Sequence, residues 1–61
     1  MIYIDKTSLI PLNRQIYNCI VDSILSKHYK PFEKLPATRK LALELSVSRN
    51  TVVLAYEKLL S

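Results

Sequence analysis

The polar run Ser48-Arg49-Asn50-Thr51 combines side chains that can recognise the edges of nucleic-acid bases. An arginine guanidinium can donate two hydrogen bonds to guanine, and an asparagine amide can pair with adenine. Serine and threonine hydroxyls bond to bases or phosphates, and the nearby Val53 can touch a thymine methyl. These residue types therefore offer the chemistry of base recognition in the DNA major groove.

A concentration of positive charge precedes this run. Between Lys27 and Lys40 five basic residues stand against one acid, Glu33, and the whole chain carries a net charge of +4. Such a surface would supply the salt-sensitive, sequence-independent part of DNA affinity. We expect Arg39 to contact backbone phosphate. The full set of expected DNA contacts is Lys34, Thr38, Arg39, Ser48, Arg49, Asn50, Thr51 and Val53.

Each feature also has a simpler interpretation. A basic stretch in a loop is often only a solvated surface. The Ser-Arg-Asn-Thr run is also an ordinary helix-capping sequence, in which Ser48 stabilises the helix and Arg49 is merely exposed. A further alternative is a helical protein-interaction module that uses the outward-facing Val53 and Leu54. The combination of a basic surface with a polar helix start favours DNA.

Three helices are expected to position these residues, over about 11–26, 38–45 and 49–60. Residues of the first apolar stripe recur at helical spacing, and Pro31 and Pro36 separate the first helix from the second. Ser46-Val47 forms a tight turn, and Ser48 caps the third helix. Two short helices joined in this way form a helix-turn-helix. The expected core residues are Leu12, Ile16, Cys19, Ile20, Ile24, Phe32, Leu35, Leu41, Ala42, Leu45, Val52, Ala55, Tyr56, Leu59 and Leu60.

Composition excludes several classes of protein. The 61 residues contain one cysteine and one histidine, so no disulfide or Cys/His metal site is expected. We find no paired carboxylates, Cys/His couple or phosphate loop, and therefore expect no enzyme activity. No apolar run approaches the roughly 18 residues of a membrane span, so we expect a cytoplasmic protein. The residues Met1 to Ile4 are β-prone and are expected to form a short strand and turn.

An ordered set of motifs spans almost the whole chain and resembles the winged helix-turn-helix of the GntR family. Ser48 to Val52, followed by Ala55-Tyr56-Glu57, is most similar to the MocR-type branch. The resemblance implies an all-α, mainly three-helix domain of a bacterial transcription regulator, whose C-terminal wing hairpin would begin past Ser61. The other matching motifs are Pro11-Leu12, Gln15-Ile16-Tyr17, Ile24-Leu25, Leu35-Pro36, Arg39, Leu41-Ala42, Val47 and Leu59.

The same resemblance implies partners and contacts. The full-length regulator would bind double-stranded operator DNA as a homodimer. Base and phosphate contacts would fall on Arg39, Ser48, Arg49, Asn50 and Thr51. In MocR-type members an aminotransferase-like domain carries pyridoxal phosphate. That domain lies outside these residues, so no cofactor is assigned to this chain.

The chain departs from the family at its turns and at one helix cap. Lys27, Phe32 and Ser46 stand where glycine is common, and a side chain at positive φ costs on the order of 1 kcal/mol. The usual serine cap of the second helix is Ala37 here, and its glutamate partner is Lys40. We therefore expect Thr38 to cap this helix one residue later.

Overall fold

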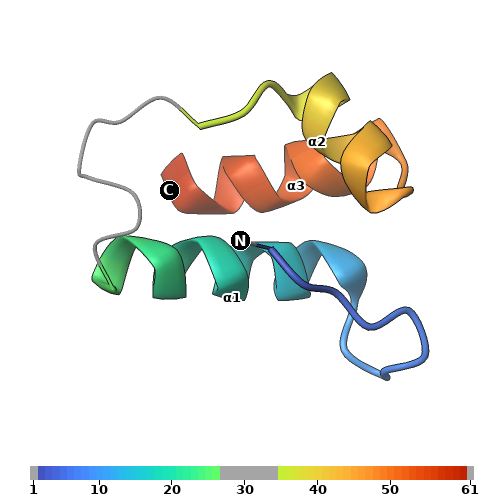
Figure 1. Cartoon of the computed structure of the whole chain (residues 1–61), viewed down its shortest axis with the longest axis horizontal. Helices are drawn as coiled ribbons and strands as arrows, with labels where there is room; N and C mark the ends of the chain where they lie inside the picture. Colours follow the sequence, from blue (N-terminus) through green and yellow to red (C-terminus); the bar gives the residue numbers. More distant parts are fainter. Residues whose placement is uncertain (1, 27–34, 61) are drawn as a thin grey trace.

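The computed structural model describes residues 2–26 and 35–60, which form three α-helices. Helix α1 spans Leu12–Leu25, α2 spans Thr38–Leu45 and α3 spans Arg49–Leu60. Figure 1 shows α3 lying alongside α1, with α2 across the N-terminal end of α3. Each helix begins and ends within one residue of its expected bounds. The all-α expectation is confirmed for the described residues.

The core lies where α3 packs against both other helices. Three branched side chains, those of Ile16, Ile20 and Val52, are fully buried there, and the exposed fraction of Ile16 and Val52 is 0%. Burial of apolar surface at these positions is the main term that stabilises so small a fold. The buried apolar residues are Ile16, Ile20, Leu41, Ala42, Val52 and Ala55.

Two expected core residues are instead exposed. Ile24 is 36% exposed and Leu60 is 88% exposed. At about 100° per residue, Ile24 lies about 80° from Ile16 around α1, whereas Ser23 lies only about 20° away. Ser23 is accordingly buried. Leu60 likewise lies about 80° from Val52 around α3. Ile24 and Leu60 therefore both lie at the edge of the apolar stripe of their helix.

The turn between α2 and α3 depends on a left-handed residue. Ser46 has φ 56° and ψ 46°, and it is the one residue other than glycine with positive φ in the described parts of the chain. Its N–H donates to Leu43 O at 3.3 Å, and the Val47 N–H donates to Ala42 O at 3.1 Å. The Cβ atom of Ser46 at this positive φ therefore lowers the stability of the fold by about 1 kcal/mol, as expected from the sequence. Lys27 and Phe32, the other two glycine positions, lie outside the described residues.

Helix α2 begins without a side-chain cap. Ala37 occupies the N-cap position with φ −60° and ψ 145°, and Thr38 is already the first helical residue. The expectation that Thr38 caps the helix is therefore wrong. Its hydroxyl accepts a hydrogen bond from Arg49 instead.

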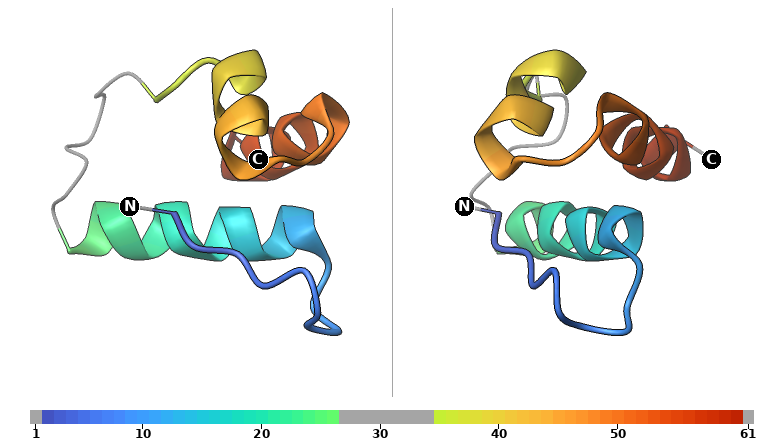
Figure 2. Two further views of the ribbon diagram at one scale, coloured as in Figure 1. Left: turned by 45° about the vertical axis from the view of Figure 1, so that its right-hand side comes forward. Right: turned by 90° about the vertical axis from the view of Figure 1, so that its right-hand side faces the viewer.

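The N-terminal segment folds back along α1 instead of forming the expected strand (Figure 2). Within the described part of the chain there is no neighbouring strand for residues 2–4 to pair with. The Gln15 side chain holds the segment, because it accepts from the Asp5 N–H at 2.7 Å and donates to Asp5 O and Ile10 O. Lys6 Nζ donates to Ser46 O at 2.7 Å, which connects this segment to the turn between α2 and α3.

Candidate nucleic-acid interface

The start of α3 is capped as expected. The Thr51 N–H donates to Ser48 Oγ at 3.2 Å, and the two hydroxyl oxygens lie 2.8 Å apart. This cap satisfies one of the free N–H groups of the first helical turn. Arg49 and Asn50 are exposed immediately after the cap, and Thr51 is half-buried. Ser48 and Thr51 therefore stabilise the helix start that presents the next two side chains to solvent.

A contact between α2 and α3 brings the candidates on α2, Thr38 and Arg39, next to the start of α3. Arg49 Nε donates to Thr38 Oγ1 at 3.3 Å, which joins the first residue of α3 to the first residue of α2. Arg39 follows Thr38 directly and is exposed, as is Lys40. The N-terminal ends of the two helices thus present their basic side chains from neighbouring positions.

Val53 lies one turn beyond Asn50 on α3. It is half-buried, whereas Leu54 beside it is 42% exposed. Asn50 and Glu57, about one turn before and one turn after Val53 on α3, are both exposed. Most of the Val53 surface is therefore covered by packing, and only the remainder can meet a ligand.

The structure places seven of the eight candidate residues. Five of them lie in the first turns of α2 and α3, Ser48 caps α3, and Val53 follows on the next turn of α3. Lys34 lies outside the described residues. The contact between Thr38 and Arg49 was not predicted from the sequence, since nothing in a spacing of 11 residues indicates it.

Residues 12–61 match the model of the family described as bacterial regulatory proteins, gntR family. The chain belongs to the GntR family. It is 41% identical over all 61 residues to the probable rhizopine catabolism regulatory protein MocR of Rhizobium meliloti. It is also 38% identical over 50 residues, or 82% of the chain, to the HTH-type transcriptional regulator TauR of Rhodobacter capsulatus. The likeness to the MocR type is thus confirmed.

This GntR-family chain spans a small part of its relatives. It covers 12% of the length of MocR and 10% of TauR. It covers 45% of the HTH-type transcriptional repressor YtrA of Bacillus subtilis, to which it is 39% identical over 97% of the chain. No solved structure matches the chain.

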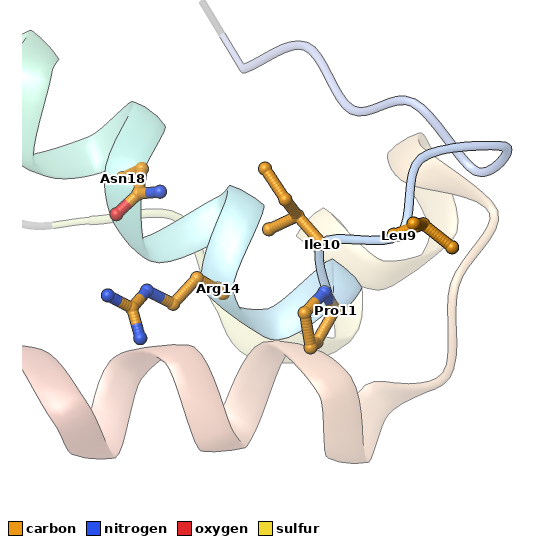
Figure 3. Close-up of a pocket in the computed structure, with 5 residues that line it drawn as sticks. All are labelled: Leu9, Ile10, Pro11, Arg14 and Asn18. Atoms are coloured by element: carbon orange, nitrogen blue, oxygen red, sulfur yellow. The ribbon is translucent and has the colours of Figure 1, made fainter.

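A second surface feature of this GntR-family chain is lined by residues that belong to neither α2 nor α3. A shallow pocket of about 460 Å³ lies at the N-terminal end of α1. Figure 3 shows Arg14 and Asn18 extending from successive turns of α1, with Leu9, Ile10 and Pro11 preceding them. Leu9 is fully exposed and Ile10 is 50% exposed. This pocket offers a cation and an amide beside an apolar rim, and it contains none of the candidate DNA contacts.

Neither a metal-binding cluster nor a membrane-spanning helix is present in the parts of the chain that the structure describes. No group of three or more His, Cys, Asp or Glu side chains there could hold a metal ion. None of the helices in residues 2–26 and 35–60 is long and apolar enough to cross a membrane. Cys19 is half-buried, and its Sγ donates to Tyr3 O at 3.2 Å, which agrees with a packing role on α1.

Proposed function

We propose that this chain is the sequence-specific DNA-binding domain of a bacterial transcription regulator, with α3 entering the major groove. The observation that carries the proposal is the start of α3, where Arg49 and Asn50 are exposed within a capped first turn and beside the start of α2. A helix in the major groove presents its N-terminal residues to base edges. The family match supports the same function.

Each residue then has a role that follows from its chemistry. Arg49 pairs with guanine and Asn50 with adenine, since these are the bidentate partners of their side chains. Val53, through its remaining exposed surface, meets a thymine methyl one turn further along. Arg39 contacts phosphate from the start of α2, whose first N–H groups lack a side-chain cap and so also favour a nearby anion.

The full-length regulator is proposed to act in the cytoplasm as a homodimer on two operator half-sites. A single module of this size would bind DNA weakly, and two modules joined in one protein raise the apparent affinity. Pyridoxal phosphate does not fit the pocket beside Arg14, because that pocket contains no lysine to hold it. We assign that cofactor, when present, to an aminotransferase-like domain outside these residues.

The proposal is tested by selecting a duplex from a random-sequence DNA pool with the 61-residue chain. Fluorescence anisotropy then measures binding to the selected duplex and to a scrambled duplex. The affinity should fall steeply with added salt, because bound phosphates release counterions. Arg49→Ala should cost about 1–3 kcal/mol of binding and relax the preference at one guanine.

Two matched variants complete this test. Arg39→Ala should weaken binding to both duplexes about equally, because phosphate contacts carry no sequence information. Arg14→Ala removes an exposed arginine of α1 that is not among the proposed DNA contacts, and should leave the preference between duplexes unchanged. Unchanged binding by Arg49→Ala would show that α3 does not enter the groove as proposed.

A protein-interaction module is the second candidate function. Its support is the exposed apolar surface of Leu54 on α3 and of Leu9 and Ile10 beside the pocket. Contacts of this kind bury apolar area, and their affinity depends only weakly on salt. The affinity of DNA binding, by contrast, falls steeply as salt is added. A flat salt response together with equal affinity for both duplexes would favour this function over DNA binding.

A further inference from the structure

Arg49 is exposed, yet its guanidinium is already held in the absence of a ligand. Its Nε–H donates to Thr38 Oγ1 at 3.3 Å. The guanidinium is planar and carries five N–H donors in a fixed arrangement, so a bond at Nε restricts the orientation of the whole group. With Nε bonded to Thr38, the other four N–H donors of the guanidinium are those of the terminal amino groups, Nη1 and Nη2. Two of these donors can meet the O6 and N7 acceptors of one guanine.

We propose that Thr38 is a positioning residue, whose hydroxyl orients Arg49 so that its terminal amino groups meet guanine end-on. This inference rests on the proposed function and deepens it. It reassigns Thr38 from a direct DNA contact to a residue that acts through Arg49.

The local structure makes Thr38 a suitable anchor. Thr38 is half-buried at the first position of α2, and its β-branched side chain has few accessible rotamers. Arg49, by contrast, has a long side chain that loses much rotamer freedom when it binds. A bond formed before binding removes part of that loss from the binding step, so the contact raises affinity by pre-organisation.

The contact also relates the two kinds of DNA recognition to each other. Arg39, the proposed phosphate contact, is the next residue after Thr38 on α2. An arginine of α3 held against the first residue of α2 therefore has a defined position relative to the phosphate contact. The protein itself therefore fixes where the proposed base contact of Arg49 lies relative to the proposed phosphate contact of Arg39.

The inference is tested with the 61-residue chain and the duplex selected from the random pool. Thr38→Val removes the hydroxyl and keeps the shape of the side chain. It should weaken binding about three- to ten-fold and relax the preference at the guanine read by Arg49, the size expected for one lost hydrogen bond. Thr38→Ser retains the hydroxyl and should bind within about two-fold of the unmodified chain. Thr38→Ala serves as a second variant without the hydroxyl.

Three readouts separate positioning from other roles. In the Arg49→Ala background, Thr38→Val should have no further effect on binding, since the two residues act as one unit. The salt dependence should be the same with and without Thr38→Val, because the number of phosphate contacts does not change. In the free protein, the NMR signal of Arg49 Nε–H should exchange slowly with water and become fast in Thr38→Val.

Each opposite result overturns the inference. An equal loss of affinity in the presence and absence of Arg49 would show that Thr38 contacts DNA directly. Full affinity and preference in both Thr38→Val and Thr38→Ala would show that the contact has no role in binding. In those two cases the proposed function stands, because the unmodified chain still binds its selected duplex. Failure of the unmodified chain to prefer any duplex would overturn the inference and the proposed function together.

Discussion

Tyr56 Oη donates a hydrogen bond to Pro36 O at 2.6 Å, and so α3 holds the segment that leads into α2. The ring of Tyr56 packs against the core, and the Pro36 carbonyl lies two residues before the first residue of α2. The bond therefore fixes the entry of the chain into α2 relative to α3. The contact between Thr38 and Arg49 depends on the same relation between the two helices.

Tyr56→Phe removes this bond and preserves the packing of the ring. The Pro36 carbonyl then loses its donor in a part-buried position, and the free energy of unfolding should fall by about 1 kcal/mol. Urea denaturation followed by circular dichroism measures the change. Tyr3→Phe is the matched control, because Tyr3 is 75% exposed and its substitution should leave stability nearly unchanged. Equal stability of Tyr56→Phe and the unmodified chain would show that the bond contributes nothing to the fold.

Local features of the fold could be predicted from the sequence. The helix bounds follow from apolar spacing and from the prolines, and the Ser48 cap follows from residue type and place. The left-handed turn at Ser46 was indicated by the glycine expected there. Each of these features is decided within a few residues, where periodicity and backbone sterics determine the outcome.

Contacts between distant residues could not be predicted in this way. Gln15 meets Asp5, Arg49 meets Thr38 and Tyr56 meets Pro36 only after the helices have packed. A helical wheel gives the face on which a side chain lies, but not the partner that comes to meet it. The failed cap shows the same limit, since the Thr38 hydroxyl bonds across the turn instead of within its own helix.

Ser46→Gly should stabilise the chain. Ser46 has φ 56°, a conformation that glycine adopts without the steric cost of a Cβ atom. The free energy of unfolding should rise by about 1 kcal/mol, and thermal unfolding should shift upward by several degrees. Ser26→Gly is the matched control: Ser26 ends α1 at φ −85°, so glycine gains nothing there. A destabilised Ser46→Gly would mean that the serine side chain makes a compensating contact.

Gln15→Ala should loosen the N-terminal segment while leaving the three helices in place. One side chain makes three hydrogen bonds, to the Asp5 N–H, to Asp5 O and to Ile10 O, at 2.7, 3.0 and 2.8 Å. Without it the Asp5 amide has no acceptor, and its hydrogen exchange should accelerate by at least about ten-fold. The amides of α3 should be little affected by comparison. Asn18→Ala, an exposed amide residue on the same helix, should leave the exchange of Asp5 unchanged.

The pKa of Asp5 is lowered from its ordinary value, chiefly because the Thr7 hydroxyl donates to Asp5 Oδ1 at 2.6 Å and the Thr7 N–H donates at 2.9 Å. Both bonds favour the ionised carboxylate. Their stabilising effect is therefore present above the unfolded-state pKa of aspartate and is lost as the pH falls through the lowered, folded-state value. Thr7→Val removes the stronger bond, so an NMR titration of the Asp5 carboxyl carbon should show a higher pKa than in the unmodified chain. Ser26→Ala should not move that titration, and an unchanged Asp5 pKa in Thr7→Val would show that the hydroxyl does not hold the carboxylate.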